Sequence, residues 1–156
     1  MGRVFNVNTT DIVDAIRLGC RTMSSVFNAD DRNFPFFSSI VRPHARLAFS
    51  AVHSESHVPG RHLNALLTAE DVAGIALDET AIQKHTKAAF FSYGGPIPLP
   101  LNRDRVGGRL ASFRPHNVRE GFHALYALVR YRQSEEAQRF AEASIDAIFE
   151  LWDPDD

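Results

Sequence analysis

The strongest structural signal in the chain lies in residues 116–152, which read HNVREGFHALYALVRYRQSEEAQRFAEASIDAIFELW. Apolar residues recur every three or four positions over 118–129 and again over 137–152, which is the spacing of one buried helix face. Only the short turn at residues 133 and 134 separates the two segments. Two long helices joined by so short a turn must lie antiparallel, so the stretch predicts a helix pair.

The same spacing predicts three more helices nearer the N-terminus, over residues 11–27, 61–68 and 79–93. Thr9, Thr10 and Asp11 are the candidate caps of the first of these helices, and Asp78 is the candidate cap of the last, because short polar side chains can accept hydrogen bonds from the first backbone N–H groups of a helix.

Two segments between the helices contain prolines that prevent a continuous helix, residues 29–60 and 94–116. Long segments of this kind in a compact domain are usually functional. We therefore expect two long functional loops, with one short strand or β-hairpin near residues 46–52.

Length and composition are those of an ordinary globular domain. The chain has 156 residues, of which 44% are hydrophobic and 23% charged. A single cysteine, Cys20, excludes an intramolecular disulfide. No apolar run approaches the ~18 residues of a membrane span, and the first residues lack the pattern of a secretory signal. We expect one soluble, cytoplasmic, mainly α domain over residues 1–156, with no membrane partner.

The charges are balanced overall but unevenly distributed. The formal net charge is −2, and the segment from Glu135 to Asp156 carries eight acidic residues and one basic residue. An acidic C-terminal helix argues against nucleic acid as a partner. All seven histidines lie between His44 and His123, so we expect any chemistry to lie in the middle of the chain.

One group of candidate residues is His53-Ser-Glu-Ser-His57. If this segment is extended, His53, Glu55 and His57 share one face. Two imidazoles and a carboxylate can share acid/base work, hold a metal ion or form structural hydrogen bonds. Because two of three ligands on one short strand are a weak metal signal, we assign no metal and no cofactor.

A second group is His116-Asn-Val-Arg-Glu120, with His123 one turn later. His116 precedes a helix, where N–H groups favour an anion, and Glu120 and His123 share a face. The alternative is a capping box in which Asn117 and Glu120 only close the start of the helix. The chain has none of the sequence motifs of serine hydrolases, phosphate-binding loops or dinucleotide-binding folds.

Residues 116–132 followed by 137–152 resemble one helical pair of an (α/α) toroid. Similar families are the unsaturated glucuronyl hydrolases, the β-L-arabinofuranosidases and the N-acylglucosamine 2-epimerases, and the resemblance covers residues 61–156. It implies antiparallel helix pairs from an incomplete toroid, either as the N-terminal part of a larger enzyme or as a protein that completes its core with a partner or a second copy.

The resemblance also implies a carbohydrate-processing protein, of hydrolase, lyase or epimerase type, that binds an oligosaccharide or uronate between segments 42–62 and 102–123. The expected proton-transfer residues are Glu55, His57, His116 and Glu120. The expected substrate-binding residues are Arg42, His53, Arg61, His62, Arg119 and His123. The competing hypothesis is a non-catalytic helical interaction or scaffold domain.

Overall fold

The computed structural model describes residues 11–40 and 43–151. Thr9, Thr10, Arg42 and Trp152, on which predictions fall, lie outside the described residues. The described part is mainly helical, as predicted. Its helices are α1 (Ile12–Met23), α2 (Val58–Ala73), α3 (Glu79–Tyr93), α4 (Pro115–Arg132) and α5 (Glu135–Leu151). None of them is long and apolar enough to cross a bilayer.

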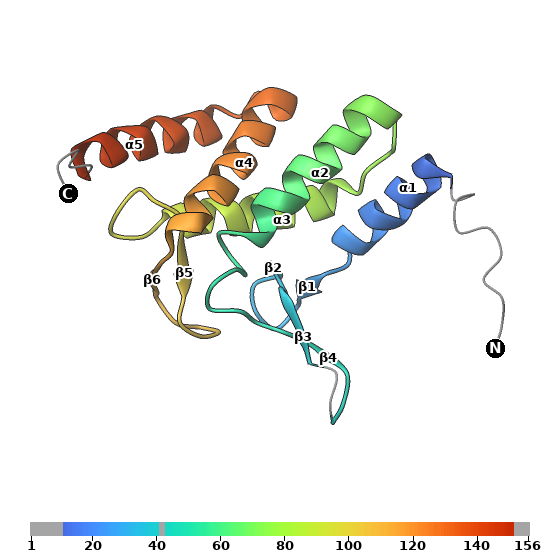
Figure 1. The fold of residues 1–156 in the computed structure, drawn as a ribbon, viewed down its shortest axis with the longest axis horizontal. Coiled ribbons are helices and arrows are strands. Elements are labelled where there is room, and N and C mark those ends of the chain that lie inside the picture. The colour runs from blue at the N-terminus through green and yellow to red at the C-terminus, as the bar shows by residue number, and fades with distance from the viewer. Residues whose placement is uncertain (1–10, 41–42, 152–156) are drawn as a thin grey trace.

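Among residues 11–40 and 43–151, three short antiparallel strand pairs lie in the connections between the helices. They are β1 (Phe27–Asn28) with β2 (Phe34–Pro35), β3 (Ser38–Ile40) with β4 (Arg46–Ala48), and β5 (Leu101–Arg103) with β6 (Leu110–Phe113). Figure 1 shows the helices together on one side of the molecule and the strand pairs on the other. The N-terminal ends of α2 and α4 point toward the strand side.

The helix boundaries follow the local capping chemistry. Asp11, one of the three candidate caps of the first helix, accepts hydrogen bonds from the N–H groups of Val13 and Asp14. Asp78 caps α3, as predicted, by accepting a hydrogen bond from the N–H group of Thr80. α2 is longer than expected at both ends. Its second residue is Pro59, which the first turn of a helix tolerates, and Gly74 ends it in a left-handed conformation at φ 61°.

The two predicted loops contain more regular structure than expected. Segment 94–116, predicted as one loop, contains the β5–β6 hairpin. Within segment 29–60 the strand near residue 46 ends at Ala48, and residues 51–57 form consecutive turns before α2 begins.

The core is centred on α2, which packs most extensively against α4. Leu63, Leu66 and Leu67 of α2 are fully buried against a cluster that includes Leu125 of α4. The two helices approach closely at Gly60, where a Cβ atom would clash with the backbone carbonyl of Glu120. This crossing fixes the first turns of the two helices side by side.

A buried arginine connects the strand side to the segment before α2. The guanidinium of Arg103 donates to both carboxylate oxygens of Asp31, at 2.8 and 2.7 Å, and through Nε to Glu55 at 2.6 Å. All three residues are at most 6% exposed. The ring of Phe34 lies 5.2 Å from the guanidinium carbon. Bidentate geometry and full pairing are what make a buried charge tolerable.

We expect Arg103→Met to lower the free energy of unfolding by about 3–5 kcal/mol, because it leaves two buried carboxylates without their cation. Chemical denaturation monitored by circular dichroism measures this loss. Arg105→Met is the matched control, since the Arg105 side chain is 80% exposed and should change stability little. Equal losses in the two variants would contradict a structural role for the buried arginine.

Candidate functional site

The candidate site is built on the turn segment 50–57 and on the first turns of α2 and α4. Asn102 of β5 holds the segment: its Oδ1 accepts from the N–H groups of Glu55 and Ser56, and its Nδ2 donates to the Val52 carbonyl at 2.9 Å. The Val52 carbonyl also accepts from Nδ2 of Asn117, at 2.7 Å. Elements distant in sequence therefore fix one short turn segment.

The expectation that His53, Glu55 and His57 share one face is wrong. Residues 51–57 are turns rather than a strand, and Glu55 points away from the histidines toward the buried Arg103. Glu55 is fully buried. Burial raises its pKa, and the hydrogen bonds and charge of Arg103 oppose that rise. The geometry gives Glu55 a structural role and removes it from contact with a ligand.

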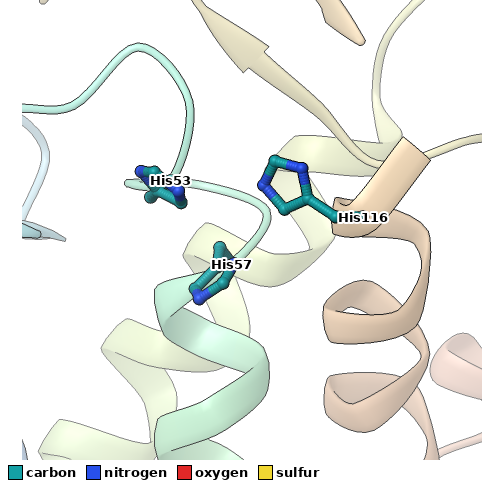
Figure 2. A group of neighbouring side chains, drawn as sticks. All are labelled: His53, His57 and His116. Atoms are coloured by element: carbon teal, nitrogen blue, oxygen red, sulfur yellow. The ribbon is translucent and has the colours of Figure 1, made fainter. Parts of the chain in front are cut away.

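The structure brings His53 and His57 together with His116 instead. His57 is the N-cap residue of α2, and His116 lies in the first turn of α4. Ring centroids are 4.8 Å apart for His53 and His57, 5.6 Å for His53 and His116, and 5.9 Å for His57 and His116. Figure 2 shows the three side chains around a common space. We call these residues the histidine cluster; it joins the two groups that the sequence left separate.

The cluster has one buried, one half-buried and one exposed member. His57 is 7% exposed, whereas His116 is exposed at the surface. Burial lowers the pKa of His53, with smaller contributions from His116 and Arg61. Burial also lowers the pKa of His57. Both imidazoles are therefore neutral near neutral pH and offer a free nitrogen lone pair.

A second cluster surrounds Glu120, in the second turn of α4. Arg61 donates to this carboxylate through Nε and Nη2, both at 3.3 Å, and Arg119 donates through Nε at 3.0 Å. Nδ1 of His123 lies 3.5 Å away. Glu120 is 1% exposed, but the two arginine side chains are 58% and 65% exposed. One buried anion therefore orients two cations that reach solvent.

The predicted capping box of Asn117 and Glu120 does not form. Pro115 starts α4 two residues earlier than Asn117, so Arg114 is the N-cap residue and Asn117 is already helical. The side chain of Asn117 reaches Val52, and that of Glu120 reaches the arginines. Neither side chain is used to cap the helix, and both contact other residues of the candidate site.

The charges around Glu120 decide its protonation. Burial raises its pKa, but hydrogen bonds from Arg61 and Arg119 outweigh burial and hold the pKa at about 2. A carboxylate this acidic is ionised at neutral pH and is a poor proton donor or acceptor there. Its geometry suits it to positioning the arginines.

A groove of about 790 Å³ runs between α1, α2 and α4. Ile16 and Met23 of α1 and small side chains of α2 form its apolar wall, while Arg61, Glu120 and His123 contribute polar groups. The sequence predicts a substrate cleft between segments 42–62 and 102–123, and these segments supply only some of the residues that line the groove. Cys20 also lines the groove and is 5% exposed, as expected for a small core residue.

His62 does not join either cluster. Its Nδ1 lies 3.3 Å from Nε2 of His85, which in turn lies 2.9 Å from the carbonyl of Met23. Burial lowers the pKa of His62 to about 4 and that of His85 to about 3. This neutral pair ties α1 to α2 and α3, which makes it structural.

Sequence reasoning missed the residues that support the site. Asn102 and Arg103 hold the turn segment 50–57 through hydrogen bonds, and Asp31 pairs with Arg103. The ring of Phe37 stacks on that of His53 at a centroid distance of 4.0 Å. The available signal was that Arg103 lies two residues after the apolar, proline-rich run 96–101, where a charged side chain needs a partner if it is buried. Its partners lie 48 and 72 residues away and could not be named.

The low pKa of Glu120 predicts an acid-dependent loss of stability. Its folded pKa of about 2 lies below the ordinary value of 4.5, so its contribution is complete above pH 4.5 and disappears as the pH falls to about 2. The difference in free energy of unfolding between the wild-type protein and Glu120→Gln, measured by denaturant titration, should therefore shrink across this range. In an Arg61→Gln background the loss should be complete at a higher pH. A pH-independent difference would contradict this assignment.

Comparison with known proteins does not supply a function for this arrangement. No protein-family model, no curated protein and no solved structure matches the chain. Its chemistry must be inferred from the histidine cluster and the arginines around Glu120.

Proposed function

We propose that the chain forms part of the substrate cleft of a carbohydrate-processing protein of hydrolase, lyase or epimerase type, and that it binds an acidic sugar through Arg61 and Arg119. The observation that carries the proposal is the pairing of two half-exposed arginines with one buried carboxylate. Two guanidinium groups against one anion leave a net positive charge for a ligand. The planar guanidinium also matches the two oxygens of a carboxylate.

The surroundings of the arginines support a ligand of sugar size. Arg61 and Arg119 line the groove of about 790 Å³, which lies in the usual range for small-molecule sites. His123 adds a half-exposed polar side chain suited to hydroxyl groups. The carbohydrate class itself rests on the resemblance of residues 61–156 to toroid helix pairs.

The hydrogen bonds support a division of roles among the residues expected to transfer protons. Of the four residues expected to transfer protons, Glu55 is paired with Arg103 and Glu120 is paired with Arg61 and Arg119. In the proposal both carboxylates position other groups. His57 and His116 remain, and both belong to the histidine cluster.

We expect Arg61→Gln and Arg119→Gln each to weaken the binding of a uronate oligosaccharide by about tenfold or more, because each removes charge-assisted hydrogen bonds. Isothermal titration calorimetry with a uronate oligosaccharide and a neutral one of equal length measures the effect. Arg130→Gln is the matched control, since Arg130 lies on α4 and bonds Tyr126 instead. Binding of both sugars alike, or identical binding by all variants, would contradict the proposal.

A second candidate function is a helical interaction domain, and the C-terminal half of α5 favours it. Ile145, Ile148, Phe149 and Leu151 are 44%, 36%, 69% and 67% exposed. With about 3.6 residues per turn, Ile148 and Leu151 lie on the same face as the buried Ala137 and Ser144, so the apolar face of α5 continues beyond its buried part. Contiguous exposed apolar patches of this kind mark interaction surfaces. The simplest occupant is a second copy of the chain.

If this surface mediates association, light scattering should show a concentration-dependent dimer, and Phe149→Glu should convert it to a monomer. Val106→Glu is the control, because Val106 is 48% exposed but lies in the β5–β6 turn. A wild-type monomer at every concentration would contradict the interaction function and leave the carbohydrate proposal unaffected.

A further inference from the structure

We propose that His53, His57 and His116 form a binding site for one divalent transition-metal ion of the zinc class. The inference goes beyond the proposed sugar binding and does not depend on it. It also departs from the expectation of no metal, which rested on His53, Glu55 and His57 alone.

The ligand atoms are already close together. One imidazole nitrogen from each histidine lies within 4.8 Å of the others. A tetrahedral zinc site with Zn–N bonds of about 2.0–2.1 Å requires nitrogens about 3.4 Å apart. Closing this difference needs small rotations of side chains. His116 can supply most of them, because its side chain is exposed at the surface.

The surrounding contacts are those that orient metal-bound imidazoles. Nδ1 of His53 lies 3.0 Å from Oγ of Ser50, which leaves Nε2 of His53 for a ligand. Metal-binding histidines usually engage their second nitrogen in this way. Phe37 stacks on the same ring and meets His57 edge-on, which limits ring rotation.

One buried nitrogen of the cluster is poorly satisfied. Nδ1 of His57 is buried and makes no well-formed hydrogen bond within the described residues, although a polar contact with Asn117 acts to raise the pKa of His57. Nearly all buried polar atoms are satisfied, and exceptions often mark an unseen water molecule or ion. His57 is more than nine-tenths buried, so water from bulk solvent does not readily satisfy this nitrogen.

The ligands come from a rigid base. The turn segment that carries His53 is fixed by Asn102 and Asn117, and His57 and His116 sit at the starts of two helices that cross tightly at Gly60. Three imidazole nitrogen ligands suit zinc, and three protein ligands are the number typical of sites that keep a position open for water or a substrate oxygen. Such an ion would supply Lewis-acid chemistry close to the arginines around Glu120.

Metal binding by the chelator-treated protein tests the inference directly. Titration with Zn²⁺ in a calorimeter should show one ion per chain with a Kd of about 1 µM or lower. Co²⁺ should give the intense visible absorption of four-coordinate sites. His116→Ala and His53→Ala should each weaken Zn²⁺ binding by at least tenfold. Even the loss of a residue that only orients a metal ligand typically lowers metal affinity by roughly 10- to 100-fold.

His44→Ala is the matched control, because His44 does not belong to the cluster. This variant should bind Zn²⁺ as the wild-type protein does. His116 is exposed, so circular dichroism should show that His116→Ala remains folded. The inference is overturned if the folded wild-type protein binds no ion, if Co²⁺ shows only the weak absorption of six-coordinate sites, or if His116→Ala binds Zn²⁺ unchanged.

Discussion

The pairing of Arg103 with Asp31 and Glu55 is the interaction on which the rest of the site depends. It joins three segments that are distant in the sequence: β5, the β1–β2 turn and the turns before α2. Glu55 is thereby anchored below the surface, and His53 and His57 on either side of it are directed toward His116. A salt bridge placed in the interior thus determines the geometry of histidines near the surface.

The helices could be predicted because their signals are local. Periodic apolar residues and the caps at Asp11 and Asp78 act within a few positions of the residues they affect. The capping-box pattern places the start of α4 at Asn117, but the helix begins at Pro115. Proline is well suited to the first helical position, and Arg114 is therefore the N-cap residue. The glutamate of the expected capping box is engaged by arginines, one of them 59 residues away.

The candidate site could be predicted only in its residue types. His57, His116, Arg61 and Arg119 were identified by their chemistry, but their grouping depends on contacts between distant segments. The alternation rule placed Glu55 beside two histidines, which holds for a strand and fails for the turns that the chain adopts. The missing information was tertiary: a buried arginine in β5 attracts the glutamate inward.

The span of the Arg103–Asp31 contact has a consequence for how the site comes into being. The two residues are 72 positions apart, and Arg61 and Glu120 are 59 apart. Contacts between such distant positions form late, because the chain must first close long loops. Partly folded forms would therefore contain helices but no assembled site. During synthesis, the histidine cluster and the arginine pair around Glu120 could form only after the start of α4 had left the ribosome.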